Sequence, residues 1–178
     1  VASLDDPFAQ GTAYGLRDKL VEGGLEVVAD ETYPPGTTDY STIAAKIADA
    51  DADVFVGGTQ FEDSVALVRA FEELGYAPPY MAFSTGPTLP EFDEAVGGTA
   101  NGILSPVGWS VDAQYPSNVA FVESFRETFD SEPHEDGANG YTAGQILHQA
   151  IEAVGCADNS DECQTAIRDF IRDNEFDT

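Results

Sequence analysis

The chain has 178 residues, of which 33 are acidic and 7 are basic, and its formal net charge is −26. A hydrophobic fraction of 42%, with 11 Phe and 7 Tyr, is typical of a globular protein with a buried core, not of an acidic disordered segment. Nucleic-acid binding needs clustered Lys and Arg, so the charge argues against nucleic acid and against anionic membrane surfaces as partners. No apolar run approaches the roughly 20 residues that span a bilayer, so no direct membrane insertion is expected.

The acidic excess itself needs a physical explanation. A net charge this far from zero destabilises the compact state through self-repulsion, and dissolved salt screens that repulsion. We interpret the composition as an acidic surface of the halophilic kind, adapted to a salty medium. A merely acidic protein from an ordinary medium is the alternative.

Strands and helices alternate with a period of about 30 residues through the first part of the chain. Hydrophobic patterning and Gly or Pro punctuation predict strands at 1–4, 25–29, 53–57, 79–84 and 102–107, and helices at 10–22, 40–50, 61–74 and 89–96. Such repetition with short connections predicts an α/β fold with a parallel sheet and right-handed crossovers.

The pattern changes after Trp109, where three helices follow without strands, at about 117–130, 138–154 and 161–173. Ser117 and Ser160 precede two of these helices and are predicted to be their N-caps. The change of character predicts a boundary or crossing point near residues 108–116.

Cys156 and Cys163 flank a short turn between two predicted helices. The ends of a tight helix–helix turn reach disulfide distance, and a ring of this size stabilises a fold by about 2.5 kcal/mol in the chain-entropy model. We therefore predict a disulfide, with free thiols as the alternative. No metal site is expected, because neither His134 nor His148 has ligand spacing to the cysteine pair. A disulfide implies an oxidising, extracytoplasmic compartment.

Ligands of open parallel sheets bind beyond the carboxyl ends of the strands. In this sequence those positions carry hydroxyls, amides and aromatic rings: Phe8, Thr59, Gln60, Phe61, Ser84, Thr85 and Trp109. Phe8 and Phe61 are equally consistent with core packing, and Trp109 with packing at the crossing point.

No catalytic constellation appears among these positions, so we expect no enzymatic activity and no cofactor. A phosphorylated receiver domain would need an acceptor Asp at the third strand's end, where Gly57 and Gly58 stand, and a Lys after the fifth strand, but no Lys follows Lys46. Both glycine-rich nucleotide-binding signatures are also absent from the sequence. An α/β hydrolase remains a less favoured alternative.

Several motifs, in order, resemble one family. They are Asp5-Asp6-Pro7-Phe8-Ala9-Gln10-Gly11, Gly36-Thr37-Thr38-Asp39-Tyr40-Ser41, Asp53-Val54-Phe55-Val56-Gly57-Gly58, Ala100-Asn101-Gly102-Ile103, Gly140-Tyr141-Thr142-Ala143 and Asn174-Glu175-Phe176-Asp177-Thr178. Together they resemble the type I periplasmic solute-binding proteins of ABC importers, in the leucine/isoleucine/valine-binding branch. Members are about twice as long, so the resemblance implies a fragment.

The resemblance implies a three-layer lobe in which helices flank the parallel sheet. Residues 1–108 would form the second ligand-binding lobe, residues 109–116 the interlobe crossover, and residues 117–178 helices that return to an incomplete first lobe. Two such lobes close on a small ligand by hinge motion.

The resemblance also implies roles for single residues. Phe8 matches an aromatic that contacts the ligand, and Thr59 or Gln60 matches a second contact. Ser84 stands where amino-acid binders place an acidic residue against the ligand's ammonium group. That departure removes a charge-assisted partner for a zwitterion and admits amides and small carboxylic or aromatic acids as ligands.

The function implied is capture of a small polar metabolite for an ABC importer, with the importer's permease subunits as partners. A ligand-sensing receptor domain of the same fold is the alternative. The compartment implied is periplasmic or extracellular, and the resemblance allows a lipid anchor through an N-terminal segment ahead of Val1.

The acidic surface leads to a first prediction. Added NaCl, from roughly 0.1 M to roughly 2 M, should raise the free energy of unfolding, because it screens the repulsion among excess carboxylates. Thermal unfolding followed by circular dichroism across the salt series measures this, with a neutral osmolyte of equal osmolality as control. A midpoint that stays constant or falls with NaCl would contradict the halophilic interpretation.

Overall fold

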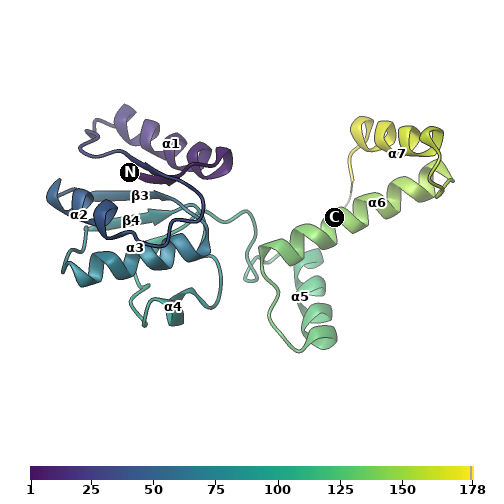
Figure 1. The fold of residues 1–178 in the computed structure, drawn as a ribbon. Coiled ribbons are helices and arrows are strands. Elements are labelled where there is room, and N and C mark those ends of the chain that lie inside the picture. Colours follow the sequence, from purple (N-terminus) through teal and green to yellow (C-terminus); the bar gives the residue numbers. More distant parts are fainter. Residues whose placement is uncertain (177) are drawn as a thin grey trace. The chain divides into compact units, whose positions relative to one another are not determined.

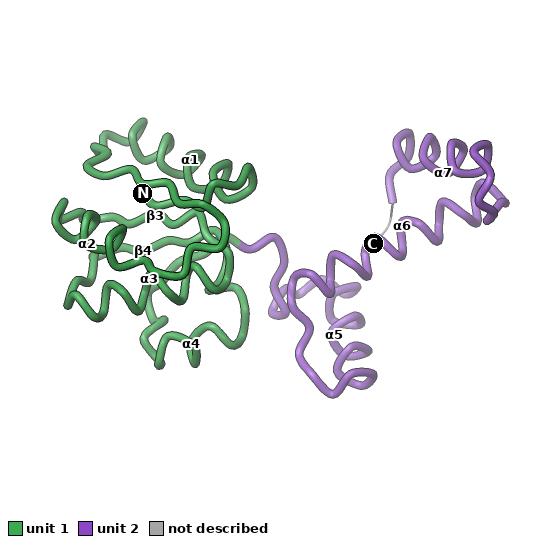
Figure 2. Tube along the Cα trace, in the orientation of Figure 1, with its two compact units in different colours: residues 1–106 green, residues 107–178 purple. Residues whose placement is uncertain are grey.

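The chain forms two compact units, residues 1–106 and residues 107–178 (Figure 2). A computed structural model describes residues 1–176 and 178, so Asp177 of the last motif lies outside the described residues. Each unit has its own hydrophobic core. The assignment of residues 1–108 and 117–178 to two lobes of a binding protein stays a prediction.

The first unit contains a five-stranded parallel sheet of order β2-β1-β3-β4-β5. The strands are β1 (Ala2–Leu4), β2 (Glu31–Tyr33), β3 (Val54–Gly58), β4 (Tyr80–Phe83) and β5 (Ile103–Leu104). The helices of this unit are α1 (Pro7–Glu22), α2 (Ser41–Asp49), α3 (Phe61–Glu73) and α4 (Phe92–Ala95). This arrangement confirms the predicted α/β fold with a parallel sheet.

Helices cover both faces of this sheet (Figure 1). Helix α1 packs against β1 and β3 on one face, and α3, which also contacts α2 and α4, lies on the other. The core under α3 is aromatic, with the Phe55 ring centroid 4.9 Å from that of Phe71 and 5.4 Å from that of Phe83. Three layers follow from this packing, as the family resemblance implies.

Two glycines at the end of β3 permit this close packing. A Cβ atom on Gly58 would lie 2.5 Å from the carbonyl oxygen of Ala9 in α1, and one on Gly57 would lie 2.5 Å from the Phe83 ring. Both distances are far below van der Waals contact. The backbone of β3 therefore approaches α1 on one face and Phe83 on the other only because these positions lack side chains.

The predicted second strand at 25–29 is wrong, since β2 begins at Glu31. A strand needs a paired neighbour, and the ladder aligns Ala2 of β1 with Glu31 and Leu4 with Tyr33. Val27 and Val28 are 40% and 54% exposed, so these apolar residues lie at the surface and do not form a buried strand.

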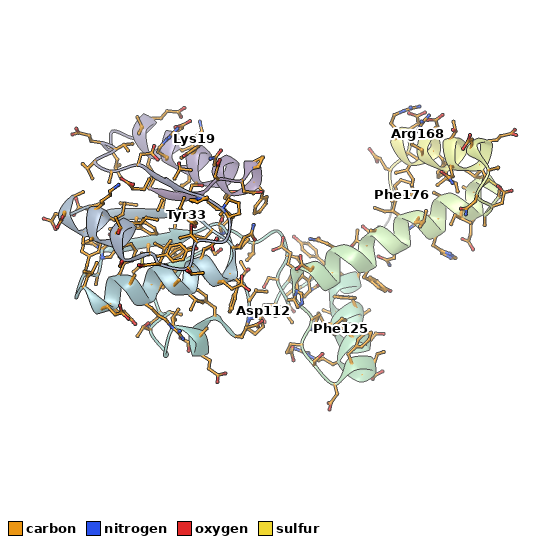
Figure 3. The ribbon with its side chains drawn as sticks, in the orientation of Figure 1. Lys19, Tyr33, Asp112, Phe125, Arg168 and Phe176 are labelled. Carbon is orange, nitrogen blue, oxygen red and sulfur yellow. A yellow bond between two sulfur atoms is a disulfide. The ribbon has the colours of Figure 1, made fainter. Side chains whose placement is uncertain are left out.

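The second unit consists of α5 (Pro116–Phe129), α6 (Glu135–Val154) and α7 (Asp161–Asp173). Its core is small: Phe121, Val122 and Ala138 are buried, with Phe125 of α5 packed against them (Figure 3). Among the helices of the described chain, none has the length and apolar character required to cross a bilayer.

The caps of these helices were only partly predicted. The Ser160 hydroxyl accepts a hydrogen bond from the Cys163 amide at 3.2 Å and confirms that N-cap. The predicted cap at Ser117 is wrong, because Pro116 is already the first residue of α5 and Tyr115 is the N-cap. Proline fits the first helical turn well, since its missing N–H would have no helical partner there.

Cys156 and Cys163 form the predicted disulfide, with their Cα atoms 6.0 Å apart. The bond closes the turn between α6, which is followed by Gly155 as a left-handed C-cap, and the first turn of α7. The cross-link thus fixes a helix–helix corner far from the sheet in sequence, and it is consistent with an oxidising compartment.

The glycine contacts lead to a prediction about stability. Gly58→Ala should lower the free energy of unfolding by about 1–3 kcal/mol, because the added methyl group overlaps Ala9 and Ser3. Urea unfolding of the purified protein measures the change. Gly140→Ala is the matched control: a Cβ atom there meets open space within α6, so the substitution should be neutral or stabilising. Equal effects of the two substitutions would contradict the packing argument.

Candidate functional site

The carboxyl ends of β1 and β3 lie side by side in the sheet. The chain leaves β1 through α1 toward β2 at one edge, and leaves β3 through α3 toward β4 in the opposite direction. This reversal of direction marks the topological switch point of the sheet, and ligands of open α/β sheets usually bind beside such a point. The segments that meet there are residues 5–8, which include the first residues of α1, and residues 59–60.

Helix α1 begins at this edge and holds Phe8 in place. Asp6 is the N-cap, and its Oδ1 atom accepts hydrogen bonds from the amides of Phe8 at 2.9 Å and Ala9 at 3.1 Å. Pro7 occupies the first helical position with a suitable φ angle. The Phe8 side chain is 58% exposed, so it is presented to solvent on a well-fixed backbone and is not part of the core.

Ser84 and Thr59 are joined by reciprocal hydrogen bonds. The Ser84 hydroxyl accepts from the Thr59 amide at 2.8 Å and donates to the Thr59 carbonyl at 2.8 Å. The Thr85 hydroxyl donates to the same carbonyl at 2.6 Å. Thr59 and Ser84 are buried, and Thr85 is half-buried. These hydroxyls therefore tie the end of β3 to the end of β4, and the ligand contacts predicted for them stay predictions.

Gln60 and Phe61 follow at the start of α3. Gln60 is exposed and is the N-cap, and its amide donates to Oδ2 of Asp63 at 3.1 Å. Phe61 is half-buried, with its ring edge-on to Phe92 at 6.3 Å between centroids. Of this pair, the side chain available to a ligand is chiefly that of Gln60.

Two tyrosines that the sequence analysis did not single out also reach this segment. Tyr33 ends β2 (Figure 3), and its hydroxyl donates to the Gly58 carbonyl at 3.4 Å; the Tyr40 hydroxyl donates to Oδ1 of Asp63 at 2.7 Å. Burial, together with the nearby Asp63 carboxylate, raises the pKa of both phenols well above the usual range. One sequence signal pointed to part of this network. Gln60 and Asp63 have the Gln-x-x-Asp spacing, which resembles a capping box.

Trp109 belongs to the second unit, and its contacts are described within that unit. Its indole N–H donates to Oδ1 of Asn118 at 2.5 Å, and its ring lies edge-on to Phe121 at 5.9 Å. Asn118 in turn donates to the Ala113 carbonyl at 2.8 Å. These contacts are those of a packing residue, and stacking on a ligand stays a prediction for Trp109.

Over residues 1–176 and 178, no group of three or more His, Cys, Asp or Glu side chains is arranged to hold a metal ion. The two histidines face single carboxylates on exposed surface, His134 near Asp136 at 3.9 Å and His148 near Glu152 at 3.4 Å. The site therefore consists of hydroxyl, amide and aromatic groups at the sheet edge.

Comparison with known proteins identifies the family. The sequence profile of the family described as periplasmic binding protein matches residues 1–176. This chain belongs to the periplasmic binding protein family. The resemblance seen in its motifs is thereby confirmed.

Two relatives of this periplasmic binding protein come from Brucella abortus strain 2308 and carry the name Leu/Ile/Val-binding protein homolog. Homolog 7 is 27% identical over 166 residues, which are 86% of this chain and 41% of the relative. Homolog 8 is 25% identical over 158 residues, which are 84% of this chain and 38% of the relative. The chain thus spans about two fifths of the length of these relatives.

Solved structures share the fold. A leucine binding protein from Thermotoga maritima matches with a TM-score of 0.80 and 24% identity, over 96% of this chain and 48% of that one. A fatty acid ABC transporter substrate-binding protein from Thermomonospora curvata matches with a TM-score of 0.74 and 16% identity, over 96% of this chain and 43% of that one. The same fold thus occurs in one protein named for leucine and in another named for a fatty acid.

The Ser84 contacts lead to a prediction about the scaffold of the site. Ser84→Ala should lower the free energy of unfolding by about 1–3 kcal/mol, because the buried amide and carbonyl of Thr59 lose this hydroxyl as a partner. Urea unfolding measures the loss, and Ser117→Ala on the exposed surface of α5 is the control. An Ala variant at position 84 as stable as the parent would show that these bonds do not hold the loops together.

Proposed function

We propose that this periplasmic binding protein captures a small polar metabolite at the carboxyl edge of its first unit and delivers it to an ABC importer. The observation that carries the proposal is the β1–β3 switch point, beside which Phe8 and Gln60 are exposed. Family membership of residues 1–176 supports a binding function. In the proposed protein this unit is one lobe, and closure of a second lobe buries the ligand.

The charges at the edge restrict the chemical character of the ligand group that faces this unit. The segments at 5–8, 34–40, 59–60 and 84–91 contain no Lys or Arg, and all of them except 59–60 contain acidic residues. The Asp6 carboxylate accepts two amides at the N-terminus of α1, and the Asp63 carboxylate lies in the first turn of α3 and accepts from the Gln60 backbone amide. An anionic group would find no cation here and a carboxylate at each helix N-terminus, so a neutral or hydrogen-bond-donating part of the ligand faces this edge.

The ligand class follows from the same residues. Ser84 replaces the acidic side chain expected in amino-acid binders, and its hydroxyl is already engaged by Thr59. A zwitterion therefore lacks that charge-assisted partner. Amides and small carboxylic or aromatic acids stand beside amino acids as candidates, with the acid group of any such ligand held outside this edge.

Stacking on Phe8 and hydrogen bonding by Gln60 describe binding and not turnover. A nucleophile with an adjacent base is missing from the edge loops as the structure describes them, so the proposed activity is non-enzymatic. The implied partners are the importer's permease subunits, and the implied compartment is periplasmic or extracellular. A sensing receptor of the same fold would bind its ligand in the same way, and permease genes beside this one would favour import.

The first experiment identifies the ligand. The full chain, purified without denaturation, is extracted, and the released compounds are analysed by mass spectrometry, with a mock extract as control. Thermal-shift assays with the identified compound, L-leucine, L-glutamine and 4-hydroxybenzoate follow, because a ligand of the folded state raises the unfolding midpoint. Chemical turnover of the bound compound would overturn the proposal.

Phe8 provides the sharpest test of the site. Phe8→Ala should weaken binding of the identified compound by about tenfold, since truncation of an aromatic contact at the centre of a site commonly removes more than 1 kcal/mol. Isothermal titration calorimetry measures the affinity. Tyr80→Ala is the matched control, because Tyr80 is 63% exposed at the opposite, amino-terminal edge of the same sheet. Unchanged affinity in the Phe8 variant, or an equal loss in both, would place the ligand elsewhere.

A further inference from the structure

A chain of hydrogen bonds connects the loop after β2 with the backbone of the predicted ligand loop. Tyr40, immediately before α2, is buried to 5% exposure and donates its hydroxyl proton to Oδ1 of Asp63 at 2.7 Å. The other carboxylate oxygen of Asp63, Oδ2, accepts from the amide of Gln60 at 3.1 Å. One carboxylate thus links a buried phenol to the exposed residue Gln60 at the β1–β3 switch point.

A second tyrosine braces the same segment. Tyr33 lies edge-on to Tyr40 with 5.2 Å between ring centroids, and its hydroxyl donates to the Gly58 carbonyl at 3.4 Å. Tyr33 is 2% exposed, so neither ring has room to reorient. The Tyr40 hydroxyl is therefore directed at Asp63 by the packing of both rings.

We propose that Tyr40 is a positioning residue for ligand binding, which acts through Asp63 to hold the Gln60 backbone, and hence its side chain, at the β1–β3 switch point. The role in ligand binding rests on the proposed function, whereas the hydrogen bonds that hold Gln60 do not depend on it. Packing alone needs only the ring, because phenylalanine fills the same space. The hydroxyl adds a bond that orients one carboxylate, and that carboxylate caps α3 at Gln60.

The sequence offers a matched control for the removal of one phenolic hydroxyl. The Tyr76 hydroxyl donates to the Ala52 carbonyl at 2.8 Å, also in the first unit. Ala52 precedes β3, so this bond lies at the amino-terminal edge of the sheet. Tyr76→Phe therefore deletes a comparable hydrogen bond without touching the ligand loop. An effect that both variants share reflects a change in general stability. An effect confined to Tyr40→Phe reflects a change in how the ligand loop is held.

The test is native-state hydrogen exchange of single amides, followed by nuclear magnetic resonance in the full chain. In Tyr40→Phe the Gln60 amide should exchange about five- to tenfold faster than in the parent, the factor expected for loss of one typical hydrogen bond. In Tyr76→Phe it should exchange at the parental rate. Equal exchange of Gln60 in parent and Tyr40→Phe, or equal acceleration in both variants, would overturn the positioning role.

A double-substitution cycle isolates the route through Asp63. In an Asp63→Ala background, the Gln60 amide should already exchange fast, and Tyr40→Phe should add no further acceleration. A full additional acceleration would show that Tyr40 acts by another route and would overturn the proposal. The measurement needs no ligand. A failed ligand search therefore contradicts the proposed function alone, while the exchange rates decide the positioning role by themselves.

Discussion

The close approach of the chain to Gly57 and Gly58 is the constraint on which the first unit depends. Because these residues lack side chains, Ala9 of α1 and the Phe83 ring of β4 both reach the β3 backbone. That approach places the start of α1, and with it Phe8, beside the end of β3. The parallel ladder between β3 and β4 brings Ser84 within reach of both backbone groups of Thr59. The packing around the end of β3 thus depends on two residues that lack a Cβ atom.

The polar groups at this edge divide into those that hold the scaffold and those that face solvent. Buried backbone groups need partners, and the hydroxyls of Ser84 and Thr85 supply them for Thr59. Tyr33 and Tyr40 hold the same segment from the β2 side. With the loop held by hydrogen bonds from the β4 side and from the β2 side, the Gln60 backbone is already ordered before binding. Such pre-organisation increases affinity without adding a contact.

Elements whose signals are local were predictable from the sequence, and those decided by distant partners were not. The last helix was placed at its observed bounds because its N-cap Ser160 and the Ile167–Ile171 pattern are local signals. The strand expected at 25–29 failed because the register with β1, not hydrophobicity, selects residues 31–33. At the candidate site, the strand-end rule selected Phe8 and Gln60, which are exposed in the structure, and their contact with a ligand stays a prediction. It could not reveal that Ser84 is engaged by Thr59, or that Tyr40 meets Asp63, because these contacts join residues 25 and 23 positions apart.

Repulsion among the excess carboxylates acts over the whole surface, whereas the interactions that hold the candidate site act within one helical turn. One chain can therefore combine a large net charge with an ordered site. The 33 acidic side chains exceed the 7 basic ones by 26, so repulsion acts over the whole surface and responds to salt. At the β1–β3 switch point, however, Asp6 and Asp63 accept backbone hydrogen bonds at the positive ends of α1 and α3. Their charge is offset locally, within one helical turn. An acidic surface can therefore accumulate around the edge while the capped helices keep Phe8 and Gln60 in the same place.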